Sequence, residues 1–468
     1  MRKQTKWIAV LSATALLAIG AAMTSFAAWS EEDGSWVYYD ADGYQVTSTW
    51  KKSNNDWYYL DEDGYMATEK LIDDTYYVNE DGKMVTNVWV KVDNDNDSSD
   101  PEDPEGYYYY FGSNGKAYTG ESGKTVFKKI NGQKYAFDSD GKMMYGWIDK
   151  DGNKLTDDEG WKSAFYYCGD ENDGALKTGW QQLEVINDNE TKDYWFYFDD
   201  DKIVDKKNYK INGYYYCFGA NGNMLSGWQN VAASGSDADY RYYGPSSSGA
   251  RVSGWINKVP SKAMNEEANA NDDMKWFYAD SKGVLTVGKF KTINNKRYAF
   301  NDKGEMISGL VDIVASGSNI VEDVVKIEDV EQTVTGEVYY LGGDEDGAMK
   351  YASQNVTVDG ENYNYYFTKD GSKKGEGMDQ LYNNAIYVKG RKLVASTDLR
   401  YESFTYKESE YLVNTSGTIM KNKANLKDLD ENYWCTDKDG KVICGPDVTG
   451  CTKDSNGKCN TKECDHHK

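Results

Sequence analysis

Histidine and proline are scarce in this chain. Of its 468 residues, two are His and five are Pro. Both His residues, His466 and His467, stand at the C-terminal end, so a catalytic Ser-His-Asp arrangement cannot form in the body of the chain. The 77 Asp and Glu residues leave a pair of catalytic carboxylates open, but most of them fall in expected turns or polar inserts. We therefore expect a protein that is not an enzyme and has no cofactor.

Long hydrophobic runs are confined to the first residues. Three basic residues precede an apolar stretch over residues 7–23, and a small-residue site ends at Ala27. These are the three parts of a secretory signal, so we expect a signal peptide over residues 1–27 and a secreted protein. No later run is long enough to cross a bilayer, which predicts no membrane insertion.

Positive charge is in deficit. The chain has 53 Lys and Arg against 77 Asp and Glu, which gives a formal charge of −24. Binding to a polyanion requires clustered Lys and Arg, so we expect no nucleic-acid partner and no attachment to bare anionic lipid. Cationic, zwitterionic and neutral partners remain.

Aromatic residues are abundant and follow a repeated phrase. The chain has 40 Tyr residues. A run of two or three aromatics, an acidic turn closed by Gly and a hydrophobic residue recur roughly sixteen times, for example over residues 57–66 and 214–224. Alternating strands around a Gly turn form a β-hairpin, and one hairpin is marginal alone in water. The pattern predicts an all-β solenoid in which stacked hairpins bury their apolar faces against one another.

The turn glycines reveal a longer period. Every third one, from Gly64 through Gly141 and Gly222, recurs about 80 residues on, which predicts a stack that returns to the same azimuth every three hairpins. Long inserts recur largely at one junction of this period, over 93–106, 184–193 and 259–273, and the largest insert, 311–336, has enough Val and Ile to add strands of its own. The expected turn glycines are residues 43, 64, 82, 115, 141, 174, 222, 249, 283, 304, 347, 371, 390, 417 and 440.

Cysteines separate the tail from the repeats. Two of the seven lie in repeat strands, and five lie in residues 435–468. We expect a hairpin solenoid over residues 28–434 and a Cys-rich C-terminal tail or cap over 435–468. Export permits disulfides, which favours a disulfide-stapled cap and no metal site. Zinc bound by Cys459, Cys464 and the two His residues is the alternative.

The repeats resemble a known family. Residues 57–68 and the Gly-Trp pairs ending at Trp147, Trp180, Trp228 and Trp255 are similar to the choline-binding, or cell-wall-binding, repeats of Gram-positive surface proteins. The lead-in over residues 130–135 looks more like the branch found in clostridial toxins and glucan-binding glucosyltransferases. The resemblance implies a left-handed superhelix with about three hairpins per turn.

The resemblance also implies ligand sites. In this family a ligand sits in an aromatic cage made by the Trp of Gly-Trp, the first aromatic of the next strand and an aromatic from the following hairpin. Such a cage attracts a quaternary ammonium group, and sugar faces can stack on the same rings. For any one Trp, packing between hairpins is the alternative role. The candidate groups are Trp50 with Trp57 and Tyr76, Trp180 with Trp195 and Tyr214, Trp255 with Trp276 and Tyr298, Trp147 with Phe165, and Trp228 with Tyr240.

Taken together, these features predict a secreted, non-catalytic protein of the cell wall or cell surface. Its expected partner is teichoic-acid choline or a polysaccharide of the wall, held by the aromatic sites. Two alternatives remain open: an adhesin that recognises host or dietary polysaccharide through its insert loops, and a structural spacer.

Overall fold

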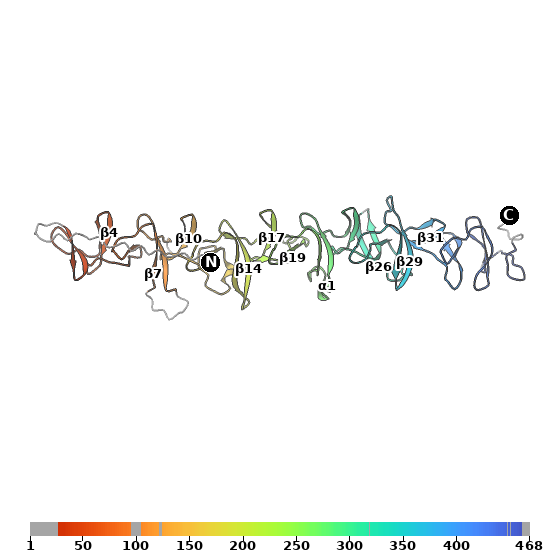
Figure 1. Cartoon of the computed structure of the whole chain (residues 1–468), viewed down its shortest axis with the longest axis horizontal. Coiled ribbons are helices and arrows are strands. Elements are labelled where there is room, and N and C mark those ends of the chain that lie inside the picture. The colour runs from red at the N-terminus through yellow and green to blue at the C-terminus, as the bar shows by residue number, and fades with distance from the viewer. Residues whose placement is uncertain are drawn as a thin grey trace. The chain divides into compact units, whose positions relative to one another are not determined.

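The computed structural model describes residues 27–94, 104–120, 124–317, 319–446, 448–449 and 451–460. Nearly all of the expected signal peptide, most of the 93–106 insert, and the tail residues Cys464, His466 and His467 lie outside these ranges. The chain divides into two units. Figure 1 labels several of their strands. Unit 1 comprises residues 1–209 and 218–224, and unit 2 comprises residues 210–217 and 225–468.

Unit 1 consists of antiparallel hairpins and one short 3-10 helix, η1 (Gly160–Ser163). Its strands are β1 (Ala28–Glu32), β2 (Ser35–Tyr39), β3 (Thr49–Ser53), β4 (Asp56–Leu60), β5 (Lys70–Ile72), β6 (Tyr76–Val78), β7 (Val88–Asp93), β8 (Gly106–Phe111), β9 (Val126–Ile130), β10 (Gln133–Phe137), β11 (Trp147–Ile148), β12 (Tyr166–Tyr167), β13 (Gly179–Asn187), β14 (Glu190–Asp199) and β15 (Lys202–Ile203). The division between the units passes through β16 (Tyr209–Ile211), β17 (Tyr214–Phe218) and β18 (Met224–Leu225).

Unit 2 is built in the same way and contains the short helix α1 (Glu266–Ala270). Its strands are β19 (Gly227–Asn230), β20 (Tyr240–Tyr243), β21 (Gly254–Lys258), β22 (Lys275–Ala279), β23 (Lys289–Ile293), β24 (Lys296–Phe300), β25 (Leu310–Ser316), β26 (Ile320–Lys326), β27 (Glu337–Tyr340), β28 (Ala352–Val358), β29 (Glu361–Phe367), β30 (Gln380–Tyr382), β31 (Ala385–Val388), β32 (Arg391–Lys392), β33 (Tyr401–Tyr406), β34 (Ser409–Asn414), β35 (Lys423–Lys427), β36 (Tyr433–Thr436) and β37 (Val442–Cys444). The prediction of an all-β solenoid of hairpins is confirmed.

The acidic turns bind their own backbone. In the turn after β4, Asp61 accepts hydrogen bonds through Oδ1 from the backbone N–H groups of Asp63 (3.1 Å) and Tyr65 (2.8 Å). Gly64 closes this turn with φ of +84°, a conformation that side chains disfavour. Asp or Asn accepts the same pair of bonds at positions 40, 79, 138, 149, 280, 301, 414, 437 and 454. Turn geometry therefore explains much of the acidic composition.

A backbone hydrogen bond joins many of the hairpins to the one before. Two residues after the turn Gly82, the N–H of Met84 donates to the carbonyl of Trp57 in the preceding hairpin, at 2.8 Å. The N–H of Met306 donates to Trp276 in the same way, at 2.7 Å. Equivalent bonds run from residue 66 to 36, 117 to 75, 143 to 108, 176 to 134, 203 to 165, 251 to 215, 349 to 297, 377 to 338 and 419 to 384.

The turn glycines also permit this close approach. A Cβ at Gly440 would lie 2.2 Å from Cγ2 of Ile419, which is 3% exposed. At Gly43, in the first described hairpin, a Cβ would meet nothing within 4 Å. One expected turn glycine is corrected here: a Cβ at Gly371 would meet open space, whereas one at Gly375 would lie 2.2 Å from Met349 Sδ. The residue that packs on the preceding hairpin in that long turn is therefore Gly375.

The largest insert does form strands, as its composition predicts. β25 and β26 pair with each other and join the sheet β24-β23-β26-β25-β27. Val311, Ile313 and Val321 are buried there against the hairpin residues Phe290 and Tyr339. This insert is part of the core of unit 2.

The close approach at the turn glycines predicts unequal costs for alanine. Gly440 and Gly213 have the same φ of +90°, but a Cβ at Gly213 would meet nothing within 4 Å. Gly213→Ala should cost about 1–2 kcal/mol of stability for its backbone conformation alone. Gly440→Ala should cost about 1–3 kcal/mol more, because the buried Ile419 cannot move aside. Thermal unfolding of both variants measures this difference, and equal melting temperatures would contradict it.

Burial predicts that Cys168 is unreactive. This side chain is fully buried in a core with Ala136, Ile148 and Leu176, and burial raises the pKa of its thiol to about 12. Since the thiolate is the reactive form, iodoacetamide at pH 8 should leave Cys168 unmodified in the native protein and modify it after denaturation. Peptide mass spectrometry measures both states, and rapid native labelling would show that this core opens.

Candidate functional site

The tryptophan positions share one pairing register. Trp255 of β21 lies opposite Tyr278 of β22, and Trp276 precedes that tyrosine by two residues. Trp180 with Tyr197 and Trp50 with Tyr59 pair in the same way, and Trp195 and Trp57 stand two residues before those tyrosines. The inserts therefore lengthen the far end of a hairpin without changing which side chains share a face.

Unit 2 brings one predicted trio together. The rings of Trp255 and Trp276 have centroids 6.0 Å apart and planes at 87°, so they form two walls at nearly a right angle. Tyr298, from the next hairpin, lies 4.8 Å from Trp255 with its plane at 69°. Tyr298 is 8% exposed, and burial raises the pKa of its hydroxyl. Tyr278 packs on Trp255 from the opposite strand, at 5.2 Å.

In unit 1, Trp180 and Trp195 also form a corner. Their centroids are 6.2 Å apart and their planes are at 83°. Tyr197 lies 5.1 Å from Trp180 on the opposite strand, and Phe218 lies 5.7 Å away. Tyr214, the predicted third member, belongs to unit 2 and is 64% exposed.

The Trp50 group is only partly assembled. Trp50 contacts Tyr59 and Tyr76, each at 5.2 Å. Trp57 is outside this ring cluster and 40% exposed, and the ammonium of Lys52 lies 6.0 Å from the centroid of its ring. Lys52 therefore lies near this ring, and the predicted trio is not assembled at Trp57.

Two further predicted pairs are not brought together. Trp147 packs on Tyr167 (4.5 Å) and Phe196 (5.3 Å), whereas Phe165 packs on Tyr166. Trp228 packs on Tyr242 and Phe277 rather than on Tyr240, and its indole N–H donates to the carbonyl of Val259 at 3.0 Å. These two tryptophans fill the space between hairpins.

Sequence reasoning missed the aromatic residue directly opposite each tryptophan. In each case it stands two residues after the predicted aromatic: it is Tyr59, Tyr167, Tyr197, Tyr242 or Tyr278. Antiparallel alternation within the aromatic run was the available signal, because every second residue shares a face. The register itself depends on hairpin length, which the inserts obscure.

Several aromatic faces already hold cations. The ammonium of Lys154 lies 3.4 Å from the ring centroid of Tyr145, and that of Lys142 lies 4.2 Å from Tyr107. These four side chains and Met143 line a cavity of about 280 Å³.

 Two lysines of this chain lie over the aromatic rings that line this cavity. A cation over a ring face is attracted by the ring quadrupole, so these contacts show that the exposed tyrosine faces of this chain attract positive charge.

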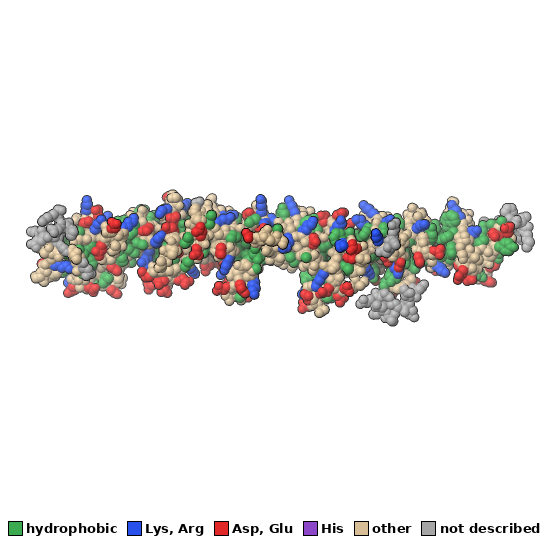
Figure 2. All heavy atoms as spheres, turned by 180° about the vertical axis from the view of Figure 1, so that it is seen from behind, with side chains coloured by type: hydrophobic (Ala, Val, Ile, Leu, Met, Phe, Trp, Pro, Cys, Tyr) green, Lys and Arg blue, Asp and Glu red, His purple; other side chains and the backbone are tan. Residues whose placement is uncertain are grey.

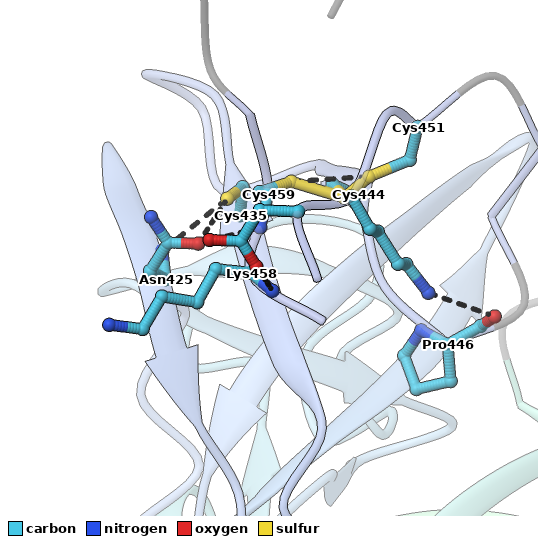
Figure 3. The surroundings of a disulfide bond; sticks show 9 residues. Asn425, Cys435, Cys444, Pro446, Cys451, Lys458 and Cys459 are labelled. Carbon is cyan, nitrogen blue, oxygen red and sulfur yellow. Dashed lines mark hydrogen bonds between the residues drawn. A yellow bond between two sulfur atoms is a disulfide. The ribbon is translucent and has the colours of Figure 1, made fainter. Parts of the chain in front are cut away.

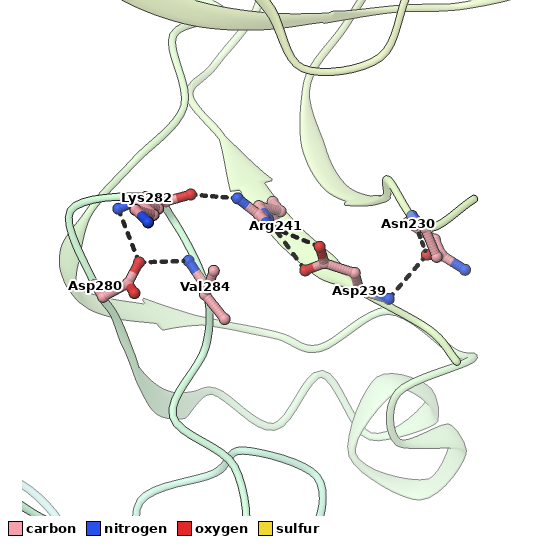
Figure 4. A network of polar contacts seen from close by, with 7 residues as sticks. Asn230, Asp239, Arg241, Asp280, Lys282 and Val284 are labelled. Carbon is pink, nitrogen blue, oxygen red and sulfur yellow. Dashed lines mark hydrogen bonds and ion pairs between the residues drawn. The ribbon is translucent and has the colours of Figure 1, made fainter. Parts of the chain in front are cut away.

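An arginine network fixes the hairpin that precedes the Trp255 trio. Arg241 donates through Nε (3.0 Å) and Nη2 (2.6 Å) to the two carboxylate oxygens of Asp239, and through Nη1 to the carbonyl of Lys282 (Figure 4). Asp280 accepts from the N–H groups of Lys282 (2.8 Å) and Val284 (2.9 Å) in the same turn. The guanidinium therefore ties β20 to the turn that follows β22.

Three cysteines of the tail converge. The sulfur atoms of Cys444, Cys451 and Cys459 lie within 4.8 Å of one another, and Cys444 is placed for a disulfide with either of the other two (Figure 3). A sulfur atom forms one disulfide, so these two pairings are alternatives. Cys435 lies in the same cluster as a buried thiol whose Sγ accepts from the N–H of Asn425 at 3.3 Å.

Charge is mixed over the molecule. Figure 2 shows acidic and basic side chains interspersed over the face drawn, with hydrophobic side chains between them.

Among the described residues, no helix is both long and apolar enough to cross a membrane.

Comparison with known proteins identifies the repeats. The choline-binding repeat model matches residues 28–70 and 46–89, and the putative cell wall binding repeat model matches residues 127–143. Residues 28–89 carry choline-binding repeats. Glucosyltransferase-S of Streptococcus mutans is 26% identical over 222 residues, an alignment that covers 37% of this chain. The chain matches only 14% of that relative's length.

Two solved structures of proteins from Streptococcus pneumoniae are also similar to this chain. Choline-binding protein F of Streptococcus pneumoniae is 20% identical, with a TM-score of 0.37, and the match covers 76% of this chain and all of that one. The modular autolysin LytC of the same organism, solved with a synthetic peptidoglycan ligand, is 19% identical, with a TM-score of 0.37. That match covers 60% of this chain and 52% of the autolysin.

The convergence of three sulfur atoms predicts a single disulfide, in which Cys444 pairs with one of two other cysteines. In a non-reducing digest of the oxidised protein, Cys444 should be linked to Cys451 or to Cys459. Mass spectrometry of the linked peptides measures this. A link between Cys435 and Cys444 would contradict the arrangement in Figure 3.

Proposed function

We propose that this chain is a secreted, non-catalytic protein that attaches to choline or polysaccharide of the cell wall through aromatic sites between its hairpins. The Trp255–Trp276–Tyr298 trio carries the proposal. Two indoles at nearly a right angle, with a tyrosine from the next hairpin, offer several ring faces to one ligand. Ring faces attract a quaternary ammonium group, and the apolar face of a sugar stacks on them equally well.

The charge of the chain is consistent with this partner. A formal charge of −24 attracts cationic and zwitterionic groups and repels polyanions without a cationic group of their own. The choline of a teichoic acid provides such a cation. Export through the segment over residues 1–27 and retention at the surface by the repeats complete the proposal.

Several weak sites would act together. One cation–ring contact contributes about 0.5–2 kcal/mol, so a single site binds weakly. Linked sites on one chain raise the overall affinity because the second binding event is intramolecular. The trio in unit 2 and the Trp180–Trp195 corner in unit 1 are the two best-formed sites among the described residues.

A second candidate rests on a cavity beside the largest insert. Arg297, Glu337, Lys374, Glu376 and Lys389 are among the side chains around this space of about 360 Å³. Burial and the nearby Glu337 carboxylate raise the pKa of Glu376. A polar cavity with both signs of charge is suited to hydrogen bonding with a glycan, which favours the adhesin alternative at this place.

Removing Trp276 should weaken binding. Trp276→Ala deletes one wall of the trio, and the loss of about 0.5–2 kcal/mol should lower affinity for choline or for cell-wall polysaccharide roughly 2- to 30-fold. Trp57→Ala is the matched control, because Trp57 lies outside the ring cluster around Trp50 and the variant should bind like the original. Isothermal titration and retention on washed cell walls measure both variants.

The combined variant tests avidity. Trp180→Ala with Trp195→Ala and Trp276→Ala should abolish retention on cell walls, and free choline should elute the unmodified protein if choline is the ligand. Retention that survives this triple change but is lost in Lys374→Ala would favour the cavity beside the insert. A native protein that is retained by neither choline nor polysaccharide would leave the spacer role.

A further inference from the structure

Four cysteines of the tail lie in one small cluster. Cys435, Cys444 and Cys459 are buried there, and Cys451 packs against them and is partly buried. Ile443 is the one aliphatic side chain among the described residues of this cluster. So small a core buries too little apolar surface to hold a fold, and segments of this kind depend on a disulfide or a bound metal. The sulfur atoms therefore supply the cross-link of the tail.

These cysteines flank two acidic turns of the same kind. Cys435 precedes one turn and Cys444 follows it, and the two residues are paired across β36 and β37. Cys451 and Cys459 flank the next acidic turn. Structural zinc sites of proteins are commonly built from four cysteine thiolates, supplied in two pairs that are close in sequence. The tail therefore has the ligand types and the pairing that such a site requires.

One disulfide cannot use all of these sulfur atoms. The sulfur atoms of Cys444, Cys451 and Cys459 lie within 4.8 Å of one another, and those of Cys451 and Cys459 are 3.2 Å apart (Figure 3). Any disulfide within this trio leaves the third sulfur in contact with it. A zinc ion binds a thiolate at about 2.3 Å, which places tetrahedral sulfur ligands about 3.8 Å apart. In the reduced chain, the three sulfur atoms are therefore close enough together to bind one metal ion.

Asn425 connects the two pairs of cysteines. Its backbone N–H donates to Sγ of Cys435 at 3.3 Å, and its Oδ1 accepts from the backbone N–H of Cys459 at 2.9 Å. Asn425 has a φ of +56° and lies at an irregularity in the pairing of β35 with β36. Hydrogen bonds from outside the ligand set hold the ligands of a metal site in position. The chain therefore already holds one cysteine of each turn against the other.

We propose that the reduced tail binds one zinc ion through the thiolates of Cys444, Cys451 and Cys459, with Cys435 as the fourth ligand. Zinc has no geometric preference of its own and accepts a tetrahedral set of four sulfur atoms. Four protein ligands leave no open position, so the metal has a structural role and holds the two acidic turns together. Metal binding and oxidation exclude each other, because a disulfide uses two of the same sulfur atoms.

Cobalt titration tests the site in the full chain. The reduced protein is freed of metal with EDTA and titrated with cobalt chloride, because cobalt bound by a tetrahedron of thiolates has intense absorption bands. An equimolar amount should produce these bands, and zinc chloride should remove them. Cys459→Ser and Cys435→Ser should each lower the affinity for zinc more than about 100-fold, since a lost ligand weakens binding more than a lost outer partner does. Cys168→Ala, which removes a buried cysteine outside the tail, is the matched control and should keep the bands.

Alkylation of the native chain is a second measurement that needs no variant. Cys451 is partly exposed, so iodoacetamide should modify it in the reduced, metal-free chain, and equimolar zinc chloride should protect it. Peptide mass spectrometry measures both states. Equal alkylation with and without zinc, the absence of cobalt bands, or an unchanged zinc affinity in Cys459→Ser would overturn the proposal. Loss of the bands when His466 and His467 are both changed to Ala would also overturn it, because the histidines would then hold the metal.

Discussion

One backbone hydrogen bond recurs along the array: after most turn glycines, the N–H two residues further on donates to the preceding hairpin. The bond from Met306 to Trp276 is representative, at 2.7 Å. It forms only where the turn comes close to its neighbour, and the missing Cβ of the glycine allows this approach. The bond fixes the spacing between neighbouring hairpins. Because of this spacing, the aromatic side chains of one hairpin are buried against the next. An isolated hairpin has neither the bond nor the burial.

The sequence allows the hairpins to be predicted but only some of their contacts. Alternation and turn glycines are local signals, and they locate most of the turns and the extra strands of the largest insert. Ring contacts depend on strand register, which is set by hairpin length and by neighbours far along the chain. For this reason Phe165 and Tyr240 were assigned to tryptophans that instead pack on Tyr167 and Tyr242. The prediction of Gly371 in place of Gly375 was wrong for the same reason, because the two glycines differ only in whether they contact the preceding hairpin.

Aromatic faces in this chain serve three purposes. Some fill the space between hairpins, as Trp147 and Trp228 do. Others carry lysines of the chain itself, as Trp57 and Tyr145 do. The corner of Trp255 and Trp276 has a neutral amide, Asn257, opposite Trp276, in the place that Lys52 takes opposite Trp57. The residue across the strand therefore decides whether a lysine of the chain lies over the ring.

The long β13–β14 hairpin pairs Trp180 with Tyr197 in the register of the short hairpins, although its strands run on to the turn at Asp188 and Asn189. The length of a hairpin at its tip therefore does not affect how the hairpins stack on one another. Such ends can change by insertion or deletion without disturbing adjacent units, so related chains would differ in total length yet keep the same interior. The same property makes these hairpin tips suitable places to graft a foreign peptide for display.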